Sequence, residues 1–149
     1  MPAVNYELML QAAMKNKAGA NEIGGAEATF GEPDGTLLSG DIVANKRVSS
    51  LPNTDSSVKG LLAALDALAP RKPRFIDPDH GALGDGSLIA KEQAVLADLQ
   101  SRVLQLKSHG ASADEASKQL TAEFKTKYCD WEKLSPVPNV VRRVYVGAQ

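Results

Sequence analysis

The stretch GDIVANKRVSSLPNTDSSVKGLLAALDALAPRKPRFIDPDHG, residues 40–81, decides the fold of this chain. It begins inside an apolar run over 36–44, which predicts one strand or two short strands around Gly40-Asp41. Apolar residues at helical spacing then predict a helix over 56–68. A short extended run over 74–76 follows and leads into a polar turn. This order of strand, helix and strand predicts an α/β fold with a small sheet and packed helices.

The ends of several predicted helices carry recognisable signals. Thr54 or Asp55 is a candidate N-cap for the helix over 56–68. An apolar stripe predicts a long helix over 88–108, and Ser112 with Glu115 forms a capping box that opens a helix over 113–125. A short closing helix is expected after Asn139. The N-terminal residues 5–17 have helical spacing, and a glycine-rich loop is expected to follow them.

Composition excludes several classes of function. The 17 basic and 18 acidic residues give a net charge of −1, and no basic stripe favours nucleic acid as a partner. No apolar run approaches the ~20 residues of a membrane span, and no signal peptide is visible at the N-terminus. Cys129 is the single cysteine, which excludes a disulfide framework. We therefore expect a cytoplasmic protein with one domain, residues 1–149.

Asp41 and His80 are the candidate metal ligands. Each follows a predicted strand, and strands set side by side can bring their carboxyl ends to one edge of the sheet. A carboxylate and an imidazole suit a borderline metal such as zinc. Asp79 could add a further oxygen ligand. We therefore expect the Asp41 carboxylate and the His80 imidazole to lie within ~12 Å of each other, close enough to share a metal or a water.

The arrangement resembles the metallo-β-lactamase superfamily. The resemblance rests on Gly40-Asp41-Ile42-Val43, on the leucine-rich helix ending at Leu68, and on Phe75 to Gly81. The C-terminal part, with Glu92-Gln93, Trp131 and the run from Asn139 to Tyr145, resembles members with a helical C-terminal extension. The resemblance implies a truncated αββα fold: a core over 36–88, a helical extension over 89–149, and a short helix and glycine-rich loop over 1–35.

The resemblance also implies a chemistry, metal-assisted hydrolysis, in which Asp41 bridges two metals and His80 ligates the second. The superfamily's first metal site uses a His-x-His-x-Asp-His motif, whereas this sequence has only two histidines, His80 and His109. The N-terminal metal-binding half of the fold is therefore expected to be missing. We expect a metal-dependent hydrolase fold that is inactive or very weak as this chain alone, with no catalytic residue assigned. Zinc or another divalent metal is the implied cofactor, and a chain without any metal is equally compatible with the residues.

The alternative function is association without catalysis. Half of an αββα sandwich leaves a sheet face uncovered, and a second copy or a complementing chain would cover it. Other motifs in the sequence are weaker. Asp77, Asp79 and Asp85 match three positions of a calcium loop, but Ala82 stands where that loop needs glycine. Cys129 is expected to be a packing residue, because no histidine lies near it in sequence to generate a thiolate.

Overall fold

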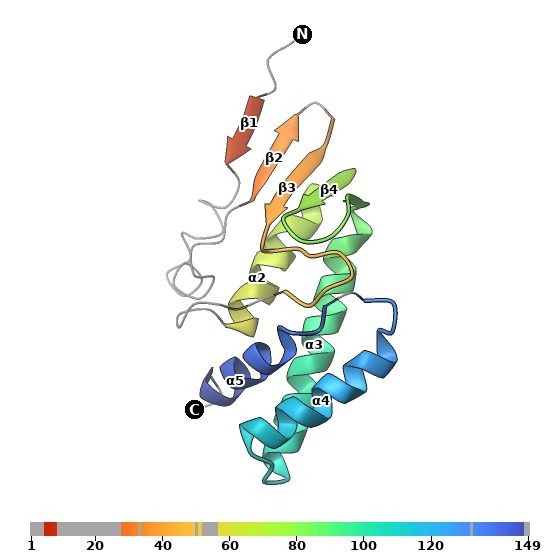
Figure 1. Ribbon diagram of the computed structural model, residues 1–149. Coiled ribbons are helices and arrows are strands. Elements are labelled where there is room, and N and C mark those ends of the chain that lie inside the picture. The colour runs from red at the N-terminus through yellow and green to blue at the C-terminus, as the bar shows by residue number, and fades with distance from the viewer. Residues whose placement is uncertain are drawn as a thin grey trace.

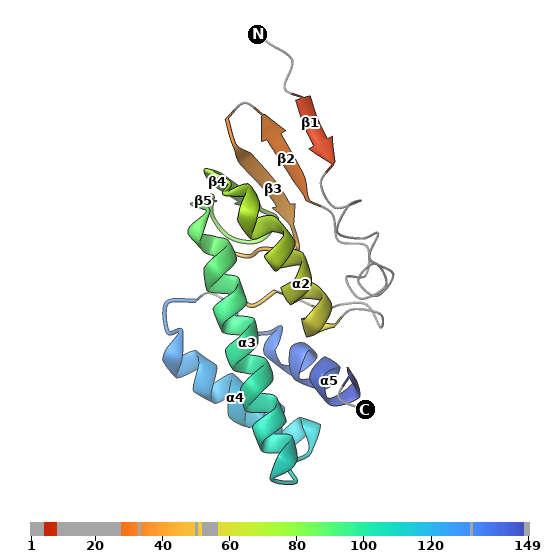
Figure 2. The same ribbon diagram turned by 180° about the vertical axis from the view of Figure 1, so that it is seen from behind.

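We describe the fold from a computed structural model of the chain. The structure describes residues 5–8, 28–32, 34–49, 51, 57–131 and 133–147. These residues form a mixed α/β fold in which a sheet and two helices lie above a second group of helices (Figures 1 and 2). None of the helices in these ranges is both long and apolar enough to cross a membrane.

Within the described ranges, the sheet has five strands in the order β1-β2-β3-β4-β5. Their bounds are Asn5–Leu8 for β1, Thr29–Glu32 for β2, Thr36–Gly40 for β3, Phe75–Pro78 for β4 and Gly84–Asp85 for β5. Strands β3 and β4 are parallel, and the other neighbours are antiparallel. The chain direction at the end of β3 is therefore the same as at the end of β4, which places both carboxyl ends at one edge.

The prediction of a helix over 5–17 is wrong for its first four residues. Residues 5–8 form β1, which pairs with β2 from Asn5 opposite Glu32 to Leu8 opposite Thr29. Four residues with helical spacing can equally serve as a strand when a neighbouring strand supplies backbone partners, so tertiary pairing overrides the local period. The rest of the expected helix lies outside the described residues. Strand β2 also occupies part of the stretch over 1–35 that was expected to be loop.

Helix α2, Val58–Leu68, connects β3 to β4 and lies on one face of the sheet (Figure 2). Its N-cap is Ser57, whose hydroxyl accepts a hydrogen bond from the Gly60 N–H at 2.9 Å. The candidates Thr54 and Asp55 lie outside the described residues, and the helix begins after them. A 3₁₀ turn, η1, Ala69–Arg71, ends the helix and leads into β4.

Helices of the described residues also follow the sheet along the chain. Helix α3, Ser87–Ser108, packs beside α2 and extends beyond the sheet, where α4, Ala113–Lys127, and α5, Val137–Gly147, pack on its lower half (Figure 1). The predicted helices over 88–108 and 113–125 are confirmed, as is the capping box between Ser112 and Glu115. The two capping bonds supply partners for N–H groups that the first turn of a helix leaves unpaired.

A single apolar core joins the sheet to all of these helices. Leu37 and Ile76 alternate with exposed Leu38 and Phe75 along β3 and β4, so only one face of these strands is buried. The loop over 41–49 passes from the end of β3 between the sheet and the C-terminal helices (Figure 1). Its residues Ile42, Val43 and Val48 are fully buried, which fixes this loop in the core.

Candidate functional site

Asp41 and His80 meet at the carboxyl edge of β3 and β4. The Asp41 Oδ1 lies 3.1 Å from the His80 Nε2. Asp41 directly follows β3, and His80 comes two residues after β4, so the parallel pairing of the strands brings them together. Both side chains are about half exposed, which leaves them open to a solute. The predicted proximity of these two residues is therefore confirmed.

The turn that carries His80 is fixed by hydrogen bonds to the end of β3 and to the loop after it. The Asn45 N–H donates to the His80 carbonyl at 3.1 Å, and the Asn45 side-chain amide donates to the Ala82 carbonyl at 2.8 Å. The Asp79 N–H donates to the Gly40 carbonyl at 3.3 Å. The loop that supplies Asp41 thus also orients His80. Asn45 was missed by sequence reasoning, although it stands only four residues after Asp41.

Gly81 allows this close approach. It has a φ of +101°, and a Cβ at this position would lie 2.3 Å from the Asn45 carbonyl oxygen. A side chain would therefore clash with the backbone atoms that hold the His80 turn, and the positive φ would add strain. The His-Gly pair of the sequence is explained by this contact.

The donor set at this edge is chemically suited to a metal but small. Two ligand atoms that each lie about 2 Å from a tetrahedral ion are roughly 3.3 Å apart, close to the 3.1 Å between Asp41 and His80. Across the described ranges, however, no group of three or more His, Cys, Asp or Glu residues is placed to hold one ion. Asp79 therefore does not join Asp41 and His80 in such a group. The two residues fit half of a tetrahedral zinc shell.

Glu92 on α3 is a second polar feature close to this edge. Its side chain is 1% exposed, and its Oε1 accepts a hydrogen bond from the Ser49 N–H at 3.1 Å. The backbone of Ala44 also donates to the carboxylate. Burial raises the pKa of Glu92 to about 7, and the hydrogen bonds from Ser49 and Ala44 oppose this rise. In the sequence Glu92 belongs to a predicted helix and to the stretch that resembles a helical extension, but no pattern there predicts that its carboxylate is buried.

A cavity of about 210 Å³ lies beside Glu92. Its walls come from the loop after β3, from the start of α3 and from the segment after α4. The lining residues are Ala44, Asn45, Lys46, Leu88, Lys91, Glu92, Asp130 and Trp131. The ammonium of Lys46 is 3.1 Å from the Asp130 carboxylate, so these two charges balance each other. The cavity thus joins the loop of the Asp41–His80 edge to the buried carboxylate.

The remaining candidates from the sequence have structural roles or none. Asp85 accepts a hydrogen bond from the Ser87 N–H at 2.8 Å at the start of α3, and hydrogen bonds from Ser87 hold the pKa of Asp85 below its usual value. His109 follows α3, and its Nδ1 lies 2.7 Å from the Gln105 carbonyl. Cys129 is exposed, so the expected packing role is wrong. The turn after α4 directs its side chain outward.

No protein-family model matches the chain, and no curated protein matches it. Among solved structures, a metallo-β-lactamase family protein from Thermus thermophilus aligns with 82% of this chain, at 22% identity and a TM-score of 0.53. A metallo-β-lactamase from Pontibacter korlensis aligns with 48% of the chain, at 25% identity and a TM-score of 0.43. This chain spans 40% of the Thermus structure and 35% of the Pontibacter one. The alignment with the Thermus structure shows that the α/β fold described above is that of part of a metallo-β-lactamase-like domain.

Proposed function

We propose that the carboxyl edge of β3 and β4 binds a divalent metal, with Asp41 and His80 as ligands, in a fold of the metal-dependent hydrolase type. The observation that carries this proposal is the 3.1 Å separation of the Asp41 Oδ1 and the His80 Nε2 at the exposed ends of two parallel strands. A partly open position is what a catalytic metal needs, because a substrate or water must reach it. Zinc is the metal that this pair of donors favours.

The chemistry of such a site depends on how many ligands surround the ion. A bound zinc ion polarises substrate oxygens and lowers the pKa of bound water. Asp41 and His80 would anchor the ion through one carboxylate oxygen and one neutral imidazole nitrogen. Because no third His, Cys, Asp or Glu of the described residues joins Asp41 and His80, other ligands such as water must complete the shell. We therefore expect weak zinc affinity and very low hydrolytic activity from this chain alone.

Zinc titration of the metal-free protein tests this assignment. We expect calorimetry to show one saturable zinc site in the wild-type chain. Asp41→Asn and His80→Ala should each weaken zinc binding by at least ~10-fold, since even loss of a residue that only supports a ligand costs that much. His109→Ala removes the other histidine of the chain and is the matched control, with affinity unchanged. Asp79→Ala should also leave affinity unchanged.

Two results would contradict the proposal. The wild-type protein could bind no zinc, or His109→Ala could weaken binding as much as His80→Ala. The second result would mean that zinc binds to surface histidines in general. Circular dichroism spectra of each variant establish that a loss of binding does not come from a loss of fold.

A second candidate function, association without catalysis, rests on a different observation. Leu38 and Phe75 are 40% and 38% exposed on the face of the sheet that α2 does not cover. Apolar side chains gathered on one sheet face are a common interface feature. A second copy of the chain is the proposed occupant, and the absence of a zinc site together with a stable dimer would favour this function over the first.

A further inference from the structure

The loop over 41–49 controls both candidate ligands. Asp41 begins this loop, and Asn45 in its middle holds the His80 turn through two hydrogen bonds. A displacement of the loop would therefore change the distance between the Asp41 carboxylate and the His80 imidazole. The position of the loop therefore determines whether the Asp41 and His80 side chains stay close enough to bind one ion.

Glu92 holds this loop on both sides of Asn45. Its carboxylate accepts from the backbone of Ala44, one residue before Asn45, and from the Ser49 N–H at 3.1 Å, four residues after it. The contact with Ser49 joins positions 43 residues apart, so it ties the loop to a rigid helix rather than to itself. A carboxylate is the side chain that can accept from two backbone donors without offering a proton to either.

The surroundings of Glu92 do not neutralise its charge. The cationic groups near it are Lys91 on the same helix and Lys46 on the loop, and Lys46 is already paired with Asp130. Arg47 lies in the same loop, and its Nε is buried without a hydrogen-bond partner among the residues that the structure describes. No ion pair of Glu92 is found among the described residues. A buried carboxylate with no ion pair costs stability, so a stabilising role does not account for Glu92, whereas a positioning role does.

We propose that Glu92 is a positioning residue for the Asp41–His80 site, which it supports by holding the Ala44 and Ser49 amides most strongly while its carboxylate is ionised. The inference rests on the proposed metal site and adds a regulation to it. On protonation the carboxyl group loses its negative charge, and one of its oxygens becomes a donor and a poorer acceptor. The loop is then held less strongly to α3, and the ligands lose part of their fixed geometry.

The test compares zinc affinity of the wild-type protein and Glu92→Gln across pH. Glutamine has the same shape but one acceptor oxygen, so it imitates the protonated acid at every pH. At pH 8 we expect zinc binding by Glu92→Gln to be about 10-fold weaker, as for other residues that support metal ligands. Near pH 5.5 the wild-type residue is itself protonated, and the two affinities should agree within about twofold. Glu123→Gln, on α4, is the control and should match the wild-type protein throughout.

Stability should move in the opposite direction. The folded-state pKa of Glu92, about 7, lies above its ordinary value of 4.5. Folding stability linked to this group is therefore fully present below pH 4.5 and is lost as the pH rises through 7. Glu92→Gln should thus unfold at a higher temperature than the wild-type protein at pH 8, and at a similar temperature near pH 4.5. A residue with a merely structural role would lower zinc affinity and stability together.

Amide shifts give a readout that needs no metal. In the wild-type protein the NMR signals of the Ala44 and Ser49 amides should titrate together with a midpoint near 7, and in Glu92→Gln they should not. If the two amide signals titrate but the protein binds no zinc, the role of Glu92 in holding the loop stands and the proposed metal site is overturned. Equal zinc affinity of the wild-type protein and Glu92→Gln at pH 8, or an equal loss at both pH values, would overturn the proposed role of Glu92.

Discussion

At the scale of single residues, Gly81 and Gly110 form a natural matched pair. Both have positive φ, +101° and +83°, but only at Gly81 would a Cβ meet other atoms, with the Asn45 carbonyl oxygen at 2.3 Å. We expect Gly110→Ala to lower the free energy of unfolding by roughly 1 kcal/mol, through backbone strain alone. Gly81→Ala should lower it by roughly 2–4 kcal/mol, because the clash adds to the strain. Urea unfolding of both variants gives the comparison.

The difference between these two variants also bears on the site. Gly81→Ala must displace the contact between Asn45 and the His80 turn, so it should weaken zinc binding, whereas Gly110→Ala lies far along the chain after α3 and should not. Equal destabilisation by the two variants would show that the turn at Gly81 accommodates a side chain without an added cost in stability. The close approach of Asn45 would then have no part in fixing His80.

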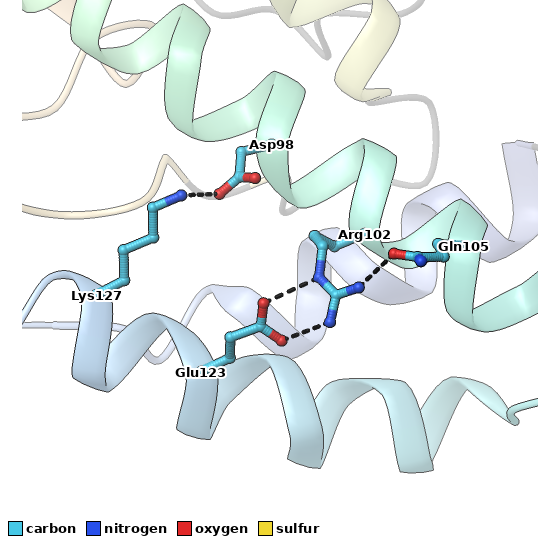
Figure 3. Close-up of polar contacts among 5 residues, drawn as sticks. All are labelled: Asp98, Arg102, Gln105, Glu123 and Lys127. Carbon is cyan, nitrogen blue, oxygen red and sulfur yellow. Dashed lines mark hydrogen bonds and ion pairs between the residues drawn. The ribbon is translucent and has the colours of Figure 1, made fainter.

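At the scale of elements, charged pairs join α3 to α4 (Figure 3). Arg102 donates twice to the Glu123 carboxylate, from its Nε at 2.9 Å and from an Nη at 2.8 Å. A further Nη of Arg102 bonds Gln105. The Asp98–Lys127 pair lies one helical turn away from it, with its nitrogen and oxygen 2.7 Å apart in a single contact. Two-point recognition of a carboxylate by arginine is the stronger of these geometries.

A double-mutant cycle measures this difference. We expect a coupling free energy of about 1 kcal/mol between Arg102→Ala and Glu123→Ala, and about 0.3 kcal/mol for Asp98→Ala with Lys127→Ala, since surface pairs are screened by water. Hydrogen bonding to Arg102 holds the pKa of Glu123 below its ordinary 4.5. The contribution of the pair is therefore present above pH 4.5 and is lost as the pH falls below it. A coupling free energy that is the same at pH 7 and pH 3 by chemical denaturation would contradict this prediction.

At the scale of the whole molecule, the exposed sheet face predicts self-association. Leu38 and Phe75 lie on neighbouring strands, and the Arg74 guanidinium sits 5.1 Å from the Phe75 ring. We expect light scattering at micromolar concentration to show a dimer that buries at least ~1,200 Å² in total. Phe75→Lys should convert the dimer to a monomer. Leu83→Lys, at a 60% exposed leucine between β4 and β5, is the control and should leave the dimer intact.

A wild-type monomer of 15.8 kDa would contradict this prediction. It would mean that the apolar face is too small or too well screened by Arg74 to drive association. A dimer that survives Phe75→Lys would place the interface elsewhere on the molecule.

Much of this architecture was determined by the sequence itself. Helices α2, α3 and α4 are specified by apolar spacing and by end signals such as the Ser112–Glu115 box, which act within a few residues. The parallel pairing of β3 with β4 follows from a strand, a helix and a strand in succession, and it predicts the meeting of Asp41 with His80. Local signals and short connections suffice for these features, because each involves neighbours in the chain or in one strand–helix–strand unit.

Only the tertiary structure decided the rest. Residues 5–8 became a strand because β2 offers an edge to pair with. The role of Glu92 depends on Ser49, 43 residues away, and the role of Asn45 depends on Ala82, 37 residues away. Burial of a carboxylate and the closeness of two loops arise from packing between distant segments. Such contacts leave no period and no spacing in the sequence.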